Sequence, residues 1–529
     1  MTEFLVYLPD PYGVGGSKYA IASSTGIVPV TAPNVSQAID VAVTYDAMTL
    51  VDDLRRSGGS PPRVLIDVGE AIRLVCGLSK SDGGEQRWSF WKRAKSHFNS
   101  PSDWRRAQAL HEGREFHPTG EDLIVAFGLV ANALTSLWRE VEGSLITHGE
   151  AERFYEVEIP VAQIFYHRQF RGVPVDKVRI SAALEEASTA KYEAYREVAK
   201  ALKISATGLT YWNIGQHLPR TDVPTIHERI EGYALRDQLK LAAHTSTFAK
   251  SFTDYQGASR DVAVLTRLSD AEERVYPVFH PFGTVSGRIL VSDPYLQELR
   301  RRFRSVIAAE DGCSLVYFDY SQFEPGVMAS LSGDADLIRL YNTGDVYTAL
   351  SESLFGSGVS RDLAKKVFLA FSYGMSASGI SSLVGGKNVD ETSRLKIERA
   401  VTAFFEQFRE VGKFKAQAEI NLSRNGYVKS VLGNHRRRSQ GGNLSPKEKR
   451  WALSHAVQAT ASLVFKKSLI EIEREFGRDS MMLPMHDAIL MQLANGDIAE
   501  ASKRVSQIME TAFLEICPQL KVRVTSGHF

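Results

Sequence analysis

The chain has 529 residues, of which 43% are hydrophobic and 24% charged. This composition indicates a globular protein of several domains and excludes collagen-like and largely disordered proteins. The formal net charge of +1 does not identify a partner, because a nucleic-acid-binding protein needs only local basic stretches. Three such stretches lie at residues 300–304, 435–438 and 447–450.

The cysteines and the apolar segments point to a reducing compartment. Cys76, Cys313 and Cys517 are far apart in the sequence, which predicts neither a disulfide framework nor a zinc site. The opening residues lack the basic region of a secretory leader. The longest uncharged run, residues 123–138, is shorter than the roughly 20 residues of a membrane span. We therefore expect a buried helix there, no membrane association and a cytoplasmic location.

The first half of the chain combines a mixed α/β segment with long helices. Residues 1–150 alternate strand-like runs with helical stretches. Residues 176–203 keep a helical period without internal Gly or Pro, which predicts one long amphipathic helix. A second helical arm over 228–252 could pack antiparallel to it, and the turn formers and prolines of 208–225 predict an exposed tip.

The second half alternates short strands with long helices. A helical block is predicted from about residue 334 to 424. The sequence GYVKSVLG at 426–433 is strand-like, and a helix is predicted over 447–473. The apolar run MMLPMHDAILMQL at 481–493 has turn and polar residues at its centre, which predicts a hairpin.

Two acidic residues lie at predicted strand ends. Asp319 ends the apolar run LVYFD, and Asp487 lies on the predicted turn of the hairpin. A carboxylate in such a place is costly unless it is solvated or bound to a metal. Two acids on adjacent strands could hold the two Mg²⁺ ions that in-line phosphoryl transfer needs. Acids at strand ends are also common turn formers, so the pair alone leaves both interpretations open.

A predicted helix over residues 361–374 carries a row of functional side chains. Arg361, Lys365, Leu369 and Tyr373 are four residues apart, so they share one face over about 18 Å. An arginine fork and a lysine charge suit a triphosphate, and the tyrosine ring suits a base. The alternative is a solvated basic face beside a buried tyrosine.

Taken together, DYSQFE, RxxxKxxxLxxxYG and MHDA occur in the order of motifs A, B and C of family A DNA polymerases. The resemblance to this family, the bacterial DNA polymerase I type, covers about residues 158–529. It also includes segments 158–176, 285–297 and 455–462. It implies an α+β multidomain fold: a right-hand polymerase with an antiparallel palm sheet and helical fingers and thumb, preceded by an RNase H-like α/β domain of the exonuclease type. The implied divisions are 1–150 (exonuclease-like), 151–262 (thumb and its palm connection), 263–333 (palm, motif A), 334–425 (fingers, motif B) and 426–529 (palm, motif C, and C-terminus).

The resemblance also implies roles for single residues. The metal ligands would be Asp319, Asp487 and the backbone carbonyl of Tyr320, and Lys365 would be a general acid toward pyrophosphate. The implied nucleotide-binding residues are Arg361, Lys365, Tyr373, Gln322, Leu369 and Glu324, the last as a steric gate against a ribose 2′-hydroxyl. The implied primer-template residues are Arg288, Gln297, Arg450, Gln458 and His486.

The same resemblance predicts cofactors and partners. Two Mg²⁺ ions, replaceable by Mn²⁺, would serve as cofactors. Primer-template DNA and dNTPs would be the main partners of a monomeric chain, alongside replisome or phage replication proteins. The absence of a 5′-nuclease region ahead of residue 158 favours a phage or mobile-element replicase.

The nucleotide pocket departs from the family pattern at several positions. Ala488 replaces a second acid, Pro325 and Gly326 replace a Leu-Arg pair, and Tyr347 replaces a histidine that binds the triphosphate. These changes indicate altered fidelity or an unusual substrate nucleotide.

Leu369 replaces the Phe or Tyr that sets discrimination at the sugar 3′ position. Because leucine lacks a phenolic hydroxyl, we expect poor incorporation of dideoxynucleotides. Chain-termination assays measure this, and efficient termination by the wild-type chain would contradict it.

The first 150 residues resemble the family's 3′–5′ exonuclease domain, but they have only a few of the acidic residues of its motifs. Asp46 and Asp122 match two acidic motifs, but Ala42 and Pro118 occupy the places of an Asn and a Tyr. Near the N-terminus only Asp10-Pro11-Tyr12 follows the first strand. Two-metal hydrolysis needs clustered carboxylates, so we expect no proofreading.

Two other functions are compatible with parts of the sequence. A single-subunit RNA polymerase shares the fold but lacks an acidic gate, so Glu324 favours deoxynucleotides. A catalytically silent primer-template binding factor would not need Asp319, Asp487 and Lys365 together.

Overall fold

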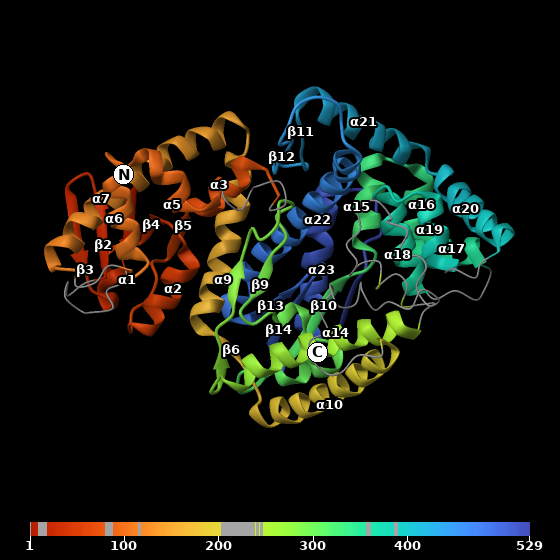
Figure 1. The fold of residues 1–529 in the computed structure, drawn as a ribbon, viewed down its shortest axis with the longest axis horizontal. Coiled ribbons are helices and arrows are strands. Elements are labelled where there is room, and N and C mark those ends of the chain that lie inside the picture. The colour runs from red at the N-terminus through yellow and green to blue at the C-terminus, as the bar shows by residue number, and fades with distance from the viewer. Residues whose placement is uncertain are drawn as a thin grey trace.

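The computed structural model describes residues 2–8, 18–79, 88–114, 118–202, 239, 243, 247–355, 361–385 and 390–529. Figure 1 shows an N-terminal domain at one end, a group of helices at the other, and a sheet with long helices between them. Two further long helices lie along one side of this central part (Figure 1).

The N-terminal domain is built on a five-stranded sheet in the order β3-β2-β1-β4-β5. The first three strands are antiparallel, and the last two run parallel to β1. This mixed sheet agrees with the α/β domain expected for residues 1–150. Its strands and main helices are β1 (Glu3–Tyr7), β2 (Tyr19–Ser23), β3 (Gly26–Val30), β4 (Val41–Thr44), β5 (Val64–Asp67), α2 (Ala47–Arg56), α3 (Val68–Cys76), α6 (Pro101–His111) and α7 (Gly120–Thr147).

Helix α7 includes the uncharged run for which a buried helix was expected. Among the described residues it is the one helix long and apolar enough to cross a membrane. Its apolar face, which includes Leu134 and Leu137, is fully buried, and α7 contacts β1 and α3. Packing in the core of the domain accounts for this buried face, while Ile124, Val125 and Ile146 of the same helix are exposed.

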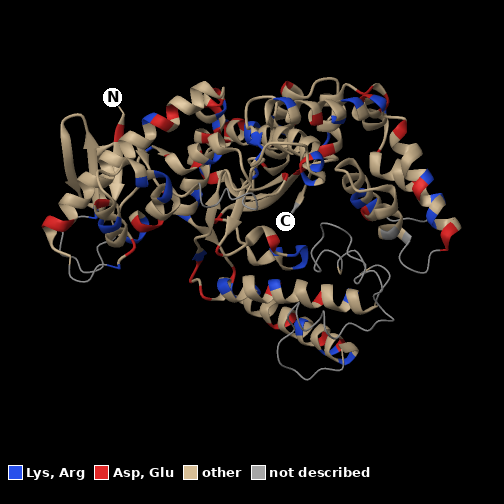
Figure 2. Cartoon of the chain, turned by 45° about the horizontal axis from the view of Figure 1, so that its top comes forward, with Lys and Arg blue, Asp and Glu red and all other residues tan. Residues whose placement is uncertain are grey.

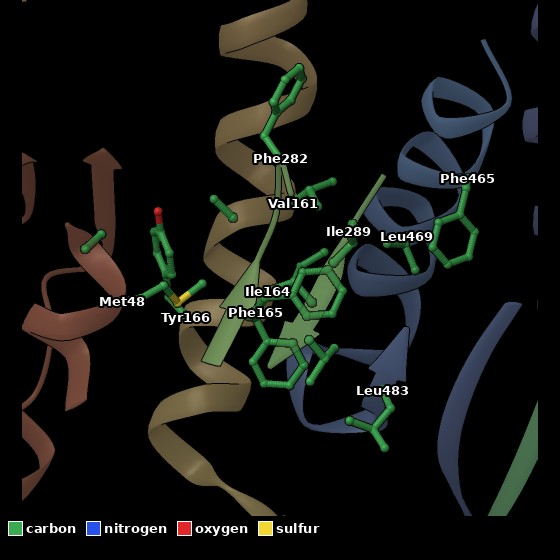
Figure 3. Packing of buried hydrophobic residues seen from close by; sticks show 14 of the residues in the cluster. Met48, Val161, Ile164, Phe165, Tyr166, Phe282, Ile289, Phe465, Leu469 and Leu483 are labelled. Atoms are coloured by element: carbon green, nitrogen blue, oxygen red, sulfur yellow. The ribbon is translucent and has the colours of Figure 1, made fainter. Parts of the chain in front are cut away.

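Helix α9 (Ile159–Arg171) joins the N-terminal domain to the central part. Figure 3 shows Met48 and Tyr166 on one side of it and Ile289, Leu469 and Leu483 on the other. All five belong to one continuous hydrophobic core. The N-terminal domain is therefore packed onto the central part through buried side chains.

Two long helices, α10 (Lys177–Leu202) and α14 (Thr247–Ser269), lie side by side (Figure 1). Val198, Phe248 and Phe252 form a small core between them. The helix expected over 176–203 is confirmed, whereas the second arm continues to Ser269 because buried Leu265 and Leu268 extend its apolar stripe. The expected tip at 208–225, and most of the arm before Thr247, lie outside the described residues.

The central sheet is antiparallel, in the order β13-β14-β10-β15. Helices α22 and α23 pack together beside it, and α22 begins with a capping box between Ser445 and Glu448. The expected hairpin at 481–493 is confirmed, but the strand expected over 426–433 is only two residues long. The bounds are β10 (Cys313–Tyr320), β13 (Met481–Met485), β14 (Ala488–Ala494), β15 (Val524–His528), β11 (Tyr427–Val428), β12 (Arg436–Arg437), α22 (Pro446–Phe476) and α23 (Ile498–Ile516).

The helices expected between residues 334 and 424 lie at the end opposite the N-terminal domain (Figure 1). They follow α15, which begins directly after β10. Their bounds are α15 (Phe323–Ser332), α16 (Ala335–Thr343), α17 (Val346–Phe355), α18 (Arg361–Ser372), α19 (Ala377–Gly385), α20 (Glu391–Glu406) and α21 (Arg409–Asn425). Short pairs complete the fold: β6 (Val173–Pro174) with β7 (Arg274–Val275), and β8 (Val278–His280) with β9 (Leu290–Ser292).

Candidate active site

Asp319 and Asp487 lie at the same end of the central sheet. Asp319 pairs with Ala488 across β10 and β14, so Asp487 is one residue from the partner of Asp319. His486 has a left-handed backbone (φ 64°) that forms the tight turn before Asp487. Burial and, next, the charge of Asp487 raise the pKa of Asp319 to about 6, although Lys365 and Arg304 act in the opposite direction.

The two carboxylates suit a divalent cation. Their oxygens are hard ligands of the kind that Mg²⁺ prefers, and their mutual repulsion is relieved when a cation binds. No group of three or more His, Cys, Asp or Glu side chains that could hold a metal occurs in the described part of the chain. A cation at this pair would therefore need backbone, water or substrate oxygens as well.

Tyr320, whose backbone carbonyl is the expected third ligand, is anchored by its side chain. Its hydroxyl donates to the carbonyl of Met509 at 2.6 Å. Its ring stacks on Phe323 with 4.4 Å between centroids. These contacts fix the end of β10 next to Asp319, while the coordination itself stays a prediction.

Cation binding at this pair is expected to weaken as the pH falls through about 6, because protons then compete for Asp319. The folded-state pKa lies above the unfolded value of about 4, so ionised Asp319 destabilises the cation-free fold as the pH rises across that window. NMR titration of the cation-free protein measures the midpoint, which Asp487→Asn is expected to lower. A wild-type midpoint near 4 would contradict the prediction.

Helix α18 carries the cationic row toward the acid pair. Lys365 is exposed, and its charge acts to lower the pKa of Asp319, which places its side chain on the same side of the site as that carboxylate. Leu369 is half-buried against the hydrophobic core. After the helix, a Cβ at Gly374 (φ 96°) would lie 3.0 Å from Cγ of Arg450. This close approach joins the end of α18 to the start of α22.

Glu324 lies in the first turn of α15 and is held on both sides. Arg288 Nη2 and the Tyr373 hydroxyl each donate a hydrogen bond to its carboxylate, which is 9% exposed. Burial and then Glu324 raise the pKa of Tyr373 well above its ordinary value, so its hydroxyl remains a donor. Arg288 Nη2 also lies 3.8 Å from Asp487 Oδ1. The structure therefore brings three expected site residues together beside the acid pair.

Two expected contact residues are turned inward. The Gln297 amide accepts from the Val291 N–H at 3.1 Å and donates to the Pro484 carbonyl at 2.8 Å. The Gln322 amide accepts from the Val346 N–H at 2.6 Å. Gln297 and Gln322 are each 8% exposed. Buried amides satisfied by backbone hold loops in place, and contact of these two side chains with DNA or nucleotide stays a prediction.

The remaining expected primer-template residues are at least partly accessible to solvent. His486 is exposed at the hairpin turn, and Arg450 is exposed near the start of α22. Gln458, two turns further along α22, is half-buried. Their contact with DNA stays a prediction.

The basic stretch at 435–438 is engaged within the protein. Arg436 stacks on Trp451 at 4.2 Å and Arg437 on Tyr427 at 5.5 Å. Arg438 Nε donates to Glu448 at 2.7 Å. Figure 2 shows basic and acidic residues interspersed along the described part of the chain. Among the residues that the structure describes, charge alone therefore does not mark out a DNA-binding surface.

Departures from the family pattern have local packing reasons. Ala488 is fully buried in β14, where an additional acid would be costly. A Cβ at Gly326 would lie 2.8 Å from the ring of Tyr341 and 3.1 Å from Phe513. Glycine there lets α15 approach its neighbours closely.

Two site residues were missed by the sequence analysis. Arg304 lies over the rings of Tyr317 and Phe529, at 5.4 and 5.3 Å, and acts on Asp319. Asp345 pairs with Arg361 at 2.7 Å. In the sequence, Arg304 stands out only as part of the basic run 300–304. For Asp345, the one local signal of a structural role is its position just before a helix.

The two acids expected in exonuclease motifs, Asp46 and Asp122, lie at the starts of helices. Asp46 precedes α2 and accepts from the Thr49 hydroxyl at 2.8 Å. Asp122 completes the capping box of α7 with Thr119 and pairs with Arg106. Asp10-Pro11-Tyr12 lies outside the described residues. In the described part of the domain these acids are therefore tied to local structure.

Comparison with known proteins identifies similar sequences and folds. The model of DNA polymerase family A matches residues 219–528, more than half of the chain. Thermostable DNA polymerase I of Thermus caldophilus is 30% identical over 278 residues, which are 48% of this chain and 32% of that protein. Thermostable DNA polymerase I of Thermus filiformis is 26% identical over 475 residues, 79% of this chain and 56% of that protein. DNA polymerase I of Bacillus subtilis is 25% identical over 447 residues, 78% and 49% of the two chains.

A solved structure shares the fold. The POL domain of Pol1 from M. smegmatis, in complex with DNA primer-template and dNTP, aligns with a TM-score of 0.72 and 21% identity. The alignment covers 96% of this chain and 92% of that chain. The right-hand fold is thereby confirmed. The matched region is between 32% and 56% of the length of the curated relatives named above.

Proposed function

The chain belongs to DNA polymerase family A, and from this premise we propose that it is a template-directed DNA polymerase that adds dNTPs to a primer 3′-hydroxyl. The observation that carries the proposal is the approach of Asp319, at the end of β10, to Asp487, in the turn just before the neighbouring strand β14, with Lys365 of α18 acting on Asp319. Family A DNA polymerases generally use divalent metal ions. We propose two Mg²⁺ ions, with Mn²⁺ as a substitute.

Each side chain of the site has a part in this proposal. Asp319 and Asp487 would hold the ions, which when bound would activate the primer hydroxyl and neutralise charge on the pyrophosphate. Arg361 and Lys365 would bind the triphosphate, and Lys365 would donate a proton to the leaving pyrophosphate. Closure of α18 over the acid pair would exclude water.

Glu324 would act as the gate against ribonucleotides. Its carboxylate is fixed between Arg288 and Tyr373, so it cannot move aside for a 2′-hydroxyl without breaking both hydrogen bonds. This rigidity favours dNTPs and argues against the RNA polymerase alternative.

Primer extension with dNTPs and with rNTPs tests the proposed function. We expect template-dependent extension by dNTPs with Mg²⁺, poor use of rNTPs, and better use of rNTPs by Glu324→Ala. Preference of the wild-type chain for rNTPs would support an RNA polymerase. Tight primer-template binding without extension would support a silent binding factor.

We expect no proofreading, because Asp46 is hydrogen-bonded to Thr49 and Asp122 is part of a capping box, whereas clustered carboxylates are needed for two-metal hydrolysis. A primer with a 3′ mismatch, incubated with Mg²⁺ and no dNTP, should keep its length. Shortening by the wild-type chain that is lost in Asp46→Ala would contradict this.

The biological setting is also a proposal. We propose a monomeric, cytoplasmic chain that works with phage or mobile-element replication proteins and whose residues 1–150 lack exonuclease activity.

A further inference from the structure

The guanidinium group of Arg361, on α18, contacts Asp345 with one edge and the ring of Tyr347 with one face. Its Nε and Nη2 both donate to Oδ2 of Asp345, at 3.1 and 2.7 Å. Its guanidinium carbon lies 5.2 Å from the ring centre of Tyr347. The guanidinium is planar and has two forked edges. The edge formed by Nη1 and Nη2 therefore faces away from Asp345, and the side chain is half exposed.

Asp345 is itself fixed at the start of α17. Its Oδ1 accepts from the backbone N–H of Thr348 at 2.8 Å and from the Thr348 hydroxyl at 3.1 Å. Burial opposes ionisation, but Arg361 and Thr348 outweigh it and lower the pKa of Asp345. The residue is therefore a charged and oriented partner for the arginine.

The turn that carries Asp345 is held by Gln322. The Gln322 amide accepts from the Val346 N–H at 2.6 Å and donates to the Gly344 carbonyl at 3.4 Å. Gln322 is buried and has a left-handed backbone (φ 53°) at the start of α15, the helix that carries Glu324. Segment DYSQFE is thus connected to Arg361 through two sets of hydrogen bonds.

Tyr347 supplies a flat surface beneath the guanidinium. It is 3% exposed, and its ring meets that of Phe368 edge-on, at 5.8 Å and 79°. Burial, followed by Glu324, raises its pKa above the ordinary value, so the phenol stays neutral. A neutral ring under a guanidinium favours cation–π stacking. The ring, more than the hydroxyl, is placed to act on Arg361.

We propose that Gln322, Asp345 and Tyr347 are positioning residues that orient Arg361 for bidentate binding of the triphosphate of the incoming nucleotide. Tyr347 then differs in kind from a histidine that contacts the phosphates, because it acts through the arginine. The inference rests on the proposed function, since it concerns the same nucleotide site.

Single-nucleotide primer extension by the full chain tests the two direct partners of Arg361. Asp345→Asn keeps the cap to Thr348 but removes the charge. We expect it to raise the KM for dNTP about 3- to 10-fold, with kcat and the Kd for primer-template within about 2-fold. Tyr347→Leu should give the same increase, whereas Tyr347→Phe should match the wild type.

A double-mutant cycle separates positioning from a general structural role. Arg361→Lys removes the fork, so adding Asp345→Asn to it should raise KM no further. Gln322→Leu should raise KM as Asp345→Asn does, and its melting temperature shows whether it folds. Asp336→Asn is the matched control, because Asp336 pairs with Arg339 on an exposed helix face.

A lower KM for dNTP in Asp345→Asn would overturn the inference, because it is expected if Asp345 competes with the triphosphate for Arg361. Equal increases of KM in Tyr347→Phe and Tyr347→Leu would also overturn it. So would fully additive effects of Asp345→Asn and Arg361→Lys on KM in the double-mutant cycle. Absence of extension by the wild type would instead contradict the proposed function. In that case, equal binding of a fluorescent dATP analogue by the wild type and Asp345→Asn would still overturn the inference.

Discussion

Asp319→Asn is expected to reduce primer extension by at least about 10³-fold, because it removes a charged ligand worth several kcal/mol of charge stabilisation at the reacting phosphate. The substitution preserves shape. Burial and Asp487 both oppose ionisation of Asp319, so the variant should fold at least as stably as the wild type. Single-turnover extension with saturating Mg²⁺ and dNTP measures the effect, and thermal unfolding monitors the fold.

Asp487→Asn should give a loss of the same order. Primer-template binding should not weaken in either variant, since the substitutions remove negative charge near DNA and so reduce repulsion. Asp336→Asn, on the exposed face of α16, should extend primers like the wild type. A folded Asp319→Asn protein with more than about a tenth of wild-type activity would contradict the metal-ligand role, given the several kcal/mol expected.

Lys365→Ala is expected to lower kcat/KM for dNTP by about 10²- to 10³-fold. The lost ammonium would both stabilise charge on the triphosphate and donate a proton. Lys365 is exposed on α18, so the fold should be unaffected. Lys365→Arg keeps the charge without a readily donated proton, so it should recover KM more than kcat. Pre-steady-state kinetics over a range of dNTP concentrations separate the two.

Lys366→Ala is the matched control for this variant. Lys366 is the next residue and is also exposed, but it points about 100° away around the helix. We expect near-wild-type kinetics from it. Equal losses in the two variants would show that general basicity of α18, and not the placement of Lys365, supports nucleotide binding.

The elements that local sequence determines were predicted well. The hairpin around His486 and Asp487 follows from apolar runs broken by a polar turn, and α10 and α22 follow from an uninterrupted helical period. The neighbouring strands β10 and β14 then bring Asp319 and Asp487 together. Asp122 shows a missed local signal, because Thr119-x-x-Asp122 is a capping-box pattern.

The direction in which a polar side chain faces could not be predicted. Gln297 binds the Pro484 carbonyl, 187 residues away along the chain, and Gln322 binds a turn 24 residues away. Sequence spacing does not specify such partners, because they depend on tertiary packing. The pairing of Asp345 with Arg361 was missed for the same reason. Helix α14 extends beyond its predicted end because buried apolar residues continue along one of its faces.

The most direct test of the central claim is anomalous diffraction from crystals of the chain with primer-template, a non-hydrolysable dNTP and Mn²⁺. We predict manganese peaks about 2.1 Å from carboxylate oxygens of both Asp319 and Asp487, adjacent to the triphosphate. Manganese bound elsewhere, or by only one of these two residues, would show that Asp319 and Asp487 do not form a shared metal site.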